Sequence, residues 1–388
     1  MNVSFKNVKI SAISVVVPQN EINIYDEVHY YNNSIKKIDR LRKMVGFHKR
    51  RIADKTTTAS DLAICAAKNL LAKTQTDKNS IEAVINVVQE PDYKNPATAY
   101  FIHQKLGLSD NCLATDVNQG CAGWVLGLLF ASQMIESGSA KKVLLLNADT
   151  PSINKKIEDR NLAPIFGDAG SATLVEYSET ENKSYFNIQT QSEGFEAIIP
   201  PLSGERFRLN YSDDKDWALL EKIRNNTITT PAGNTVTLFD AYMDGMAVFD
   251  FTMSVVPENI KQLISYADLA KEDISMLCLH QANKQIVQTV ANAAGFEEEK
   301  APYTAFENYG NNTMCSIPTT ISLLSPEVPK KNICCSGFGN GLVCASCIIN
   351  LEGTYIGPVL DFVKPEYVKT KEEYIEYWTK KIKGENNE

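Results

Sequence analysis

The sequence predicts an α/β protein built from two similar halves, and three observations support this fold class. Short apolar runs typical of buried strands alternate with segments whose apolar residues recur at helical spacing. The alternation begins again after about residue 185, so the pattern occurs twice. In both halves, unusual polar residues stand at strand ends. We therefore expect an N-terminal half at residues 1–185, a C-terminal half at 186–352 and an extension at 353–388.

The N-terminal half begins with KISAISVVVP (residues 9–18), an apolar run typical of a strand. A helix is expected from residue 61, with Ser60 as its N-terminal cap. IEAVINVVQ (81–89) is almost continuously apolar, as expected for a strand that is covered on both faces. The other elements expected in this half are a helix ending at Gly107, strands at 112–117, 141–149 and 167–177, and a buried helix after Cys121.

The C-terminal half repeats this rhythm. A helix is expected at residues 244–267 with a break at Pro257, because proline lacks the N–H group that continues a helix. A strand is expected at 274–280, ending at His280. The other elements expected here are helices at 281–295 and from residue 316, two strands around a Gly-rich turn at 331–352, and a charged tail at 369–388 that is helical until it frays.

The composition indicates a soluble, cytoplasmic enzyme. The 388 residues are 44% hydrophobic and 22% charged, which is ordinary for a globular protein. The net charge is -8 without a long Lys/Arg block, so no nucleic acid is expected as a partner. The start has no signal-peptide pattern, and the longest apolar run, 122–131, is too short to span a membrane. The nine cysteines have no framework spacing, which fits reduced thiols.

Cys121 stands between two glycines in NQGCAGWVLGLLF, directly ahead of a helix that is apolar on nearly every side. A cysteine at a helix N-terminus faces free backbone N–H groups and the positive end of the helix dipole, and both favour the thiolate. Gly120 and Gly123 permit a sharp elbow and the close approach of a substrate. The alternative is a small buried hydrophobe, the usual role of a free cysteine, and this stretch alone favours that alternative.

Three other motifs are ambiguous when each is taken singly. His280 ends a strand, where most histidines are structural; Asn311 lies in a Gly/Asn turn, where turn chemistry is sufficient to explain it. FGNGLV is typical of a hairpin.

Cys344 and Cys347 form a CxxC, but residues three apart in a strand point to opposite faces. We therefore expect core cysteines there and no metal site.

Taken together and in this order, the motifs are far more specific. The sequence resembles the β-ketoacyl-acyl-carrier-protein synthase III family of the thiolase superfamily, from residue 9 to about Leu351. The motifs that carry the resemblance are DVNQGCAGW, RNLAPIFGDAGSATLVE, LHQAN, YGNNTMCSIP and GFGNGL. The resemblance implies a five-layered αβαβα fold made of two similar halves, a homodimer, and a catalytic triad of Cys121, His280 and Asn311.

The resemblance also implies a reaction. Cys121 would take an acyl group from a thioester, and a malonyl thioester would then lose CO2 and attack that group in a Claisen condensation. The backbone N–H groups of Cys121 and Asn340 would form the oxyanion hole. His280 and Asn311 would both donate hydrogen bonds to the enolate oxygen, which requires a proton on Nε2 of His280. Acyl-CoA or acyl carrier protein would bring the substrates, and neither a cofactor nor a metal would be needed.

Four positions are implied in substrate or pantetheine binding: Asn283, Arg160, Gly245 and Asn95. For Arg160, a surface ion pair with Asp159 or Glu158 is an equal alternative. At Asn95, relatives often have a large apolar residue that bounds the acyl pocket, so the acyl group is expected to be polar or unusual. Met44 replaces an arginine that grips coenzyme A in relatives, for which Arg42, Lys49 or Arg50 would have to compensate. Asn340 replaces a glycine common in the oxyanion turn.

Several functions remain open at this stage. The departures from the family pattern at Met44, Asn95 and Asn340 suggest a specialised lipid or polyketide-type pathway. Glu90 raises a rival in which a glutamate acts as general base, as in hydroxymethylglutaryl-CoA synthases, without decarboxylation; a solvated loop carboxylate is the alternative. Acyl transfer from Cys121 to an alcohol or amine is another possibility, against which the presence of Asn311 argues. The last is a structural subunit of a heterodimeric synthase, against which the intact Cys121 and His280 argue.

Overall fold

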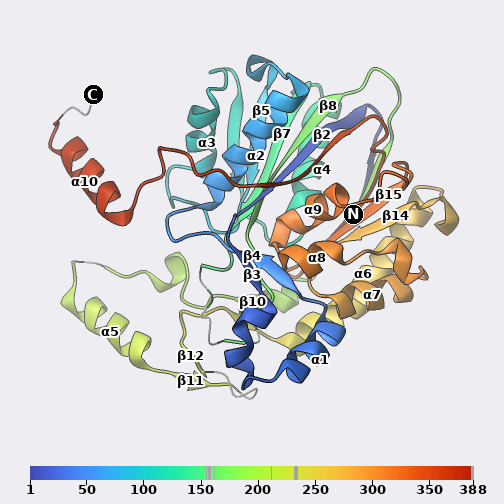
Figure 1. Cartoon of the computed structure of the whole chain (residues 1–388). Helices are drawn as coiled ribbons and strands as arrows, with labels where there is room; N and C mark the ends of the chain where they lie inside the picture. The colour runs from blue at the N-terminus through green and yellow to red at the C-terminus, as the bar shows by residue number, and fades with distance from the viewer. Residues whose placement is uncertain (154, 156–158, 161, 211, 231–234, 386–388) are drawn as a thin grey trace.

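The computed structural model describes residues 1–385 except 154, 156–158, 161, 211 and 231–234. Two large sheets organise the chain (Figure 1), and each includes one strand from outside its own half of the sequence, because β1 joins the five-stranded sheet and β17 joins the six-stranded sheet. The six-stranded sheet has the order β17-β2-β8-β7-β5-β6. Its strands are β17 (Tyr355–Asp361), β2 (Val8–Val17), β8 (Ala169–Tyr177), β7 (Lys142–Asp149), β5 (Ala83–Val87) and β6 (Leu113–Val117).

The five-stranded sheet has the order β1-β9-β16-β15-β14. Its strands are β1 (Asn2–Phe5), β9 (Ser184–Thr190), β16 (Val343–Ile349), β15 (Ile333–Gly339) and β14 (Met276–Leu279). β15 and β16 pair antiparallel with Gly339 opposite Val343, so FGNGLV closes a hairpin as expected. β14 runs parallel to β15, which brings the end of β14 beside the end of β15 that leads into this turn.

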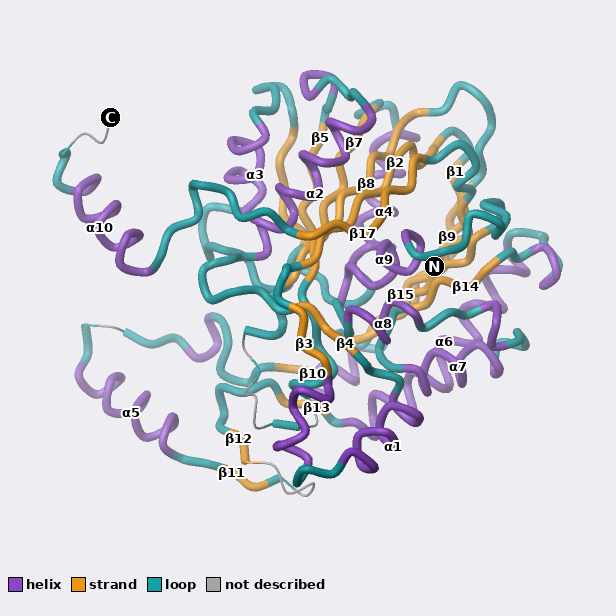
Figure 2. Tube along the Cα trace, in the orientation of Figure 1, coloured by secondary structure: helices purple, strands orange, loops and turns teal. Residues whose placement is uncertain are grey.

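Helices cover both faces of both sheets and give the five αβαβα layers that the sequence predicts (Figure 2). α2 (Ala59–Thr74) and α3 (Thr98–Leu106) pack on the outer face of the six-stranded sheet. α4 (Gly123–Glu136) and α9 (Ser316–Ser322) lie between the sheets, where their apolar residues share one core with both. α6 (Gly245–Tyr266) and α7 (Lys284–Ala293) cover the outer face of the five-stranded sheet.

The remaining elements are shorter or peripheral. A small sheet of β3 (Glu21–Asn23) and β4 (Lys49–Arg51) accompanies α1 (Ile35–Val45), and α8 (Thr304–Tyr309) precedes the turn of Asn311. The segment between β9 and α6 carries β10 (Ile198–Ile199), α5 (Asp214–Asn225), β11 (Ile228–Thr229), β12 (Thr235–Val236) and β13 (Tyr242–Met243). No helix in the described part of the chain is both long enough and apolar enough to cross a membrane.

Two local predictions are wrong, and both were overridden by context. The N-cap of α2 is Thr58, whose N–H donates to the Asp61 carboxylate at 2.9 Å, whereas the Ser60 hydroxyl donates to Asp92 at 2.6 Å. The expected break at Pro257 does not occur. α6 continues as one helix from 245 to 266, and Pro257 is buried on the side that packs against the sheet. Packing along its apolar side compensates for the missing N–H.

The cysteines of the CxxC lie in the core on opposite faces, as predicted. Cys344 belongs to the apolar cluster on the outer side of the sheet, and Cys347 to the cluster between the sheets. Cys335 and Cys347 are directly opposite each other in the register of β15 and β16. Both are completely buried, so these thiols fill core volume.

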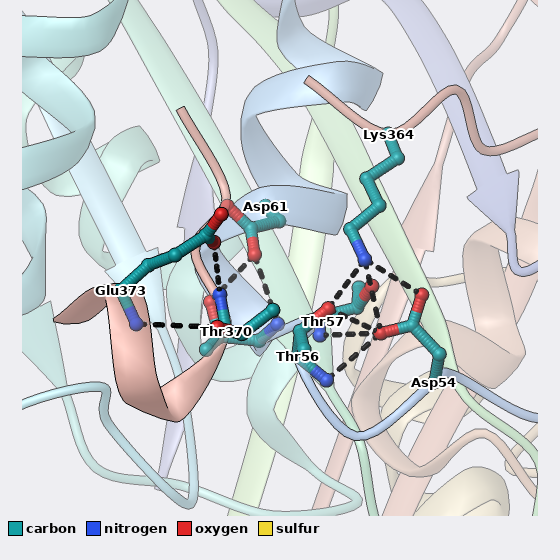
Figure 3. Close-up of polar contacts among 8 residues, drawn as sticks. Asp54, Thr56, Thr57, Asp61, Lys364, Thr370 and Glu373 are labelled. Atoms are coloured by element: carbon teal, nitrogen blue, oxygen red, sulfur yellow. Dashed lines mark hydrogen bonds and ion pairs between the residues drawn. The ribbon is translucent and has the colours of Figure 1, made fainter. Parts of the chain in front are cut away.

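The tail after residue 352 has two parts: the first adds a strand to the six-stranded sheet, and the second is a helix without buried residues. β17 pairs parallel with β2, and Phe362 behind it is buried. Lys364 then pairs with Asp54, with Nζ 3.2 Å from the carboxylate (Figure 3). α10 (Lys371–Ile382) follows, capped by Thr370 and Glu373, and it buries none of its residues against the chain.

We expect the two parts of the tail to contribute differently to stability. A chain truncated after Val368 should unfold within a few degrees of the full chain, because α10 buries nothing. A chain truncated after Glu352 loses β17 and Phe362, and a buried phenylalanine alone is worth about 3–5 kcal/mol. Thermal unfolding of both truncated chains tests this, and equal melting temperatures would contradict it.

Candidate active site

Cys121 lies between the end of β6 and the start of α4, at the level where several strands of both sheets end. α4 is fixed in the middle layer by Trp124, whose buried indole N–H donates to Oγ1 of Thr173 at 3.1 Å. A Cβ on Gly123 would lie only 2.7 Å from Val87, so glycine permits α4 to approach β5 this closely. The buried helix and its glycine elbow are as the sequence predicts.

The turn after β15 packs directly against the nucleophile. A Cβ on Gly339 would lie 3.2 Å from Sγ of Cys121, and a Cβ on Gly120 would clash with Oδ1 of Asn340. The side chain of Asn340 therefore lies over the glycine that precedes Cys121, and Gln89 approaches the same point at 2.8 Å. This juxtaposition brings together the two residues whose backbone N–H groups were expected to form an oxyanion hole.

The expectation of a stabilised Cys121 thiolate is not met. Part of the residue reaches the surface, but its thiol is enclosed by protein atoms. This burial raises the pKa of Cys121 to about 12, and the negative charge of Asp149 acts in the same direction. The free protein therefore holds a thiol, and a base must accept its proton when it attacks.

His280 directly follows β14 and is 3% exposed. Its backbone N–H donates to the Ser336 carbonyl at 2.8 Å, and its ring meets Phe338 edge-on with centroids 5.4 Å apart. Nδ1 lies 2.8 Å from Oγ of Ser316, the first residue of α9. Burial lowers the pKa of His280 to about 4, opposed by the Thr313 carbonyl, so the ring is neutral near pH 7.

Asn311 lies in the turn between α8 and α9 and is buried. Its backbone N–H donates to the Ile165 carbonyl at 2.7 Å, which ties the turn to the loop before β8. Its Oδ1 accepts from the N–H of Thr313 at 3.0 Å. With the oxygen held in this way, the amide nitrogen is the group that Asn311 can present to a substrate.

Thr313 and Asp149 are residues of the site that sequence analysis missed. Thr313 has a φ of 48°, the left-handed conformation that a β-branched residue rarely adopts. Asp149 ends β7 and is 2% exposed; burial raises its pKa to about 7, with the charge of Glu90 adding to the effect and the Thr313 side chain opposing it. The sequence signal that could have identified Asp149 is its position at the end of a strand. The residues that act on it, Glu90 and Thr313, are distant in sequence, so the sequence does not show that they meet.

Three other predicted residues are Glu90, Asn95 and Gly245. Glu90 is exposed, yet its charge acts on Asp149. Asn95 is an exposed residue of the loop between β5 and α3. Gly245 opens α6, and a side chain there would meet open space. For these three, a role in the site stays a prediction.

The residues expected to bind the carrier arm have structural partners. Asn283 caps α7 by accepting from the N–H of Ile286 at 2.8 Å. Arg160 pairs with the buried Glu27 at 2.8 Å and stacks over Tyr30 and Tyr31, an ion pair that the sequence did not predict. Of the two ion-pair partners expected for it, Glu158 lies outside the described residues.

The basic residues expected to compensate for Met44 are also engaged. Arg50 is buried and holds both oxygens of Glu27, at 2.6 and 2.9 Å. Lys49 pairs with Glu21 at 2.7 Å. Arg42 donates to the hydroxyl of Tyr25 at 3.0 Å. Arg50 is therefore a structural cation, whereas Lys49 and Arg42 lie in more accessible contacts.

The chain matches two family models. Residues 115–194 match 3-Oxoacyl-[acyl-carrier-protein (ACP)] synthase III, and residues 264–351 match the C-terminal part of 3-Oxoacyl-[acyl-carrier-protein (ACP)] synthase III. The first match contains Cys121 and Asp149, and the second contains His280, Asn311 and Asn340. The matched segments thus carry the groups that meet in the site.

Relatives and solved structures agree with these matches. The chain is 34% identical to a Campylobacter jejuni protein assigned to 3-oxoacyl-[acyl-carrier-protein] synthase 3, over 94% of this chain and 99% of the relative. It is 31% identical to Beta-ketoacyl-[acyl-carrier-protein] synthase III 2 of Staphylococcus epidermidis, over 88% of this chain and 97% of the relative. A 3-oxoacyl-(acyl-carrier protein) synthase structure from Burkholderia xenovorans superposes with a TM-score of 0.82 at 29% identity, covering 93% of this chain and 99% of that one.

We expect His280 to make stability fall in acid. Its folded pKa of about 4 lies below the ordinary histidine value of 6.5, so protonation favours the unfolded chain. The stability that neutral His280 permits is fully present above pH 6.5 and is lost as pH falls towards 4, at up to about 1.4 kcal/mol per pH unit. Asp149 acts oppositely, because its raised pKa removes stability as pH rises from about 4 to 7.

Because these two effects oppose each other, the measurement is a difference between variants. Denaturant unfolding of the wild type and of His280→Gln between pH 4 and 7 should show the wild type losing stability relative to the variant as pH falls. His29→Gln, at an exposed position, is the matched control and should run parallel to the wild type. Parallel curves for His280→Gln would contradict the prediction.

Proposed function

The chain belongs to the 3-oxoacyl-[acyl-carrier-protein] synthase III family, and from this premise we propose that it performs a two-step Claisen condensation on Cys121. As a member it is an acyl-transferring condensing enzyme of the ketoacyl synthase III type with the thiolase fold. The observation that supports the detailed proposal is the packing of the turn of Gly339 and Asn340 directly against Cys121 and the glycine before it.

In the first step, Cys121 takes the acyl group. The thiol loses its proton to a base, and Sγ attacks the carbonyl carbon of an acyl thioester. The tetrahedral intermediate carries a negative oxygen, which the backbone N–H groups of Cys121 and Asn340 stabilise; one such donor is worth roughly 3 kcal/mol. The intermediate collapses, the carbon–sulfur bond to the carrier breaks, and the carrier thiolate leaves with the electron pair and takes up a proton.

In the second step, a malonyl thioester supplies the nucleophile. Its carboxylate leaves as CO2, and the electron pair of the broken bond forms an enolate whose oxygen accepts hydrogen bonds from Nε2–H of His280 and from the Asn311 amide. The enolate carbon attacks the acyl carbon on Cys121, and the Cys121 thiolate leaves and is reprotonated. The product is a β-ketoacyl thioester.

We extend the proposal to partners and context. The substrates are acyl-CoA or acyl carrier protein and malonyl carrier protein, and the active form is a homodimer in the cytoplasm. The exposed Asn95 in the expected acyl-pocket loop and the polar side chains of Gln89 and Asn340 near Cys121 support an unusual or polar acyl group and a specialised lipid or polyketide-type pathway. No cofactor takes part in either step.

One observation favours a second candidate, condensation without decarboxylation. The charge of Glu90 acts on the buried Asp149, whose charge acts in turn on Cys121. A carboxylate that reaches this far could remove a proton from a donor thioester. Acyl transfer to an alcohol or amine has less support because Asn311 is present, and a purely structural subunit has less support because Cys121 and His280 are intact. Incubating the acylated protein with malonyl and with non-malonyl donors distinguishes the two condensations.

We expect Cys121→Ala to abolish acylation and leave the fold intact. Intact-protein mass spectrometry after incubation with acyl-CoA and acyl-carrier thioesters should show one adduct on the wild type and none on the variant. Cys65→Ala is the matched control, because Cys65 and Cys121 are the two cysteines that are not fully buried. An adduct on Cys121→Ala would overturn the assignment of the nucleophile.

Asn311→Ala should separate the two steps. Acylation should proceed at the wild-type rate, whereas release of CO2 from malonyl carrier protein should fall about 10²–10³-fold, because the enolate loses one of its two donors. Asn308→Ala removes a similar amide, bonded to the Thr304 carbonyl at 3.0 Å, and should change neither step. Equal loss of both steps in Asn311→Ala would assign Asn311 a positioning role instead.

A further inference from the structure

Two helices at the surface, α5 and α10, expose apolar side chains. Each is 12 residues long, and neither buries a residue against the rest of the described chain. In α10, Ile375 and Ile382 are 66% and 82% exposed, and Trp378 between them is 38% exposed. Spacings of three and four residues place these side chains on one face of the helix. α10 therefore presents an apolar stripe to solvent.

α5 carries a second stripe of the same kind. Leu219, Leu220 and Ile223 recur at helical spacing along it, and Leu219 is 41% exposed. An exposed amphipathic helix of this length gains little stability from its own backbone, since most helical stability in proteins comes from packing of the apolar face. Each of the two helices thus has a face that a partner would stabilise.

The charges of the two helices are complementary when the helices lie antiparallel. Each helix is acidic in its first turn and basic in its last turn. Antiparallel packing then places each acidic end beside a basic end, and opposite charges attract. The acidic residues are Asp214 and Asp216 in α5 and Glu372 and Glu373 in α10, and the basic residues are Lys222 and Arg224 in α5 and Lys380 and Lys381 in α10.

Within one chain the two helices lie apart, although both are tied to the same loop. The hydroxyl of Tyr374 in α10 lies 3.1 Å from that of Tyr93, and the neighbouring Lys94 pairs with Glu205, ahead of α5, at 3.4 Å. Because Tyr374 belongs to the start of α10, the basic end of this helix is the end far from the body. Figure 1 shows α10 reaching outward, separate from α5 on the same side of the molecule.

Both helices also lie outside the segments that match the family. The matches cover residues 115–194 and 264–351, whereas α5 falls between them and α10 follows the second. The matched segments carry the candidate active site. These matches therefore assign no role to the two helices.

We propose that two copies of this chain exchange these helices, so that the α10 of each copy packs antiparallel on the α5 of the other. A second copy fits because it supplies the helix with the complementary stripe and charges, and a two-fold axis forms the same contact twice. The ammonium of Lys381 lies 5.4 Å from the centroid of the Trp378 ring, which places a cation beside the stripe, where the Asp216 carboxylate of the second copy would meet it. The inference rests on the homodimer of the proposed function and identifies a surface that joins the copies.

Disulfide trapping tests this contact directly. A chain with Asp216→Cys and a longer, tagged chain with Lys381→Cys are co-expressed, purified together and oxidised. We expect a covalent product that contains one chain of each kind. Lys222→Cys in place of Asp216→Cys is the matched control, because it lies about 9 Å further along α5 and should link poorly.

Two results of the trapping experiment would overturn the exchange. One is an equal yield from the Lys222→Cys control, which indicates random collision. The other is a disulfide that forms within a single chain carrying both Asp216→Cys and Lys381→Cys, with none between chains. Oxidising each variant with the unsubstituted chain measures the background from the native cysteines.

The dissociation constant of the dimer gives an independent readout. Trp378→Ala should raise it about 100-fold, because a buried interface tryptophan is commonly worth a factor of ten or more and the symmetric dimer loses it twice. Sedimentation of a dilution series measures the change. Thr379→Ala is the matched control, since the Thr379 hydroxyl donates to the Ile375 carbonyl of its own helix at 2.7 Å and lies outside the stripe.

An unchanged dissociation constant for Trp378→Ala would refute the exchange. If Trp378→Ala instead abolished binding to acyl carrier protein or to anionic lipid vesicles and left the dimer intact, the stripe would belong to that partner. The outcome is separate from that of the proposed reaction. Acylation and condensation on Cys121 without a cross-link would leave the function standing and the exchange refuted, whereas a cross-linked dimer that no thioester acylates would do the reverse.

Discussion

The left-handed backbone at Thr313 is the constraint on which the geometry of the site depends. A β-branched residue adopts a φ of 48° only where its surroundings enforce it. In this conformation the N–H of Thr313 holds Oδ1 of Asn311, and its carbonyl holds the hydroxyl that contacts His280. One residue therefore bonds Asn311 directly and is linked to His280 through Ser316. The turn that contains Thr313 is anchored between α8, α9 and the loop before β8. These elements together hold the strained backbone of Thr313.

Burial sets the resting charges of the site. It raises the pKa of Cys121 and Asp149 and lowers that of His280, so each group is shifted towards its neutral form. A neutral centre costs less to bury than separated charges. In the proposed reaction charge develops only when a substrate is present, and the backbone N–H groups of Cys121 and Asn340 are the donors proposed for the oxyanion. Such preorganised donors need little rearrangement during the reaction.

The sequence predicted elements well where local signals were strong. The run at 9–18, the helix ending at Gly107 and the hairpin of FGNGLV all formed as expected, since periodicity and turn residues agree there. The errors arose where tertiary contacts outweighed a local rule. The Ser60 hydroxyl donates to Asp92 and does not cap α2. Pro257 lies inside a helix that packs against the five-stranded sheet. Neither contact can be inferred from neighbouring residues.

The sequence alone determined which residues are the candidates for the chemistry, because Cys121, His280 and Asn311 lie in motifs whose order along the chain is itself specific. Only the tertiary structure decided what surrounds them. Asp149 acts on Cys121 across the site, Ser316 contacts His280 from 36 positions away, and Arg160 is held by Glu27 from 133 positions away. The physical reason is that pKa values, tautomers and ion pairs depend on burial and on neighbours through space. The chain fixes these only when both sheets and the layer between them have assembled.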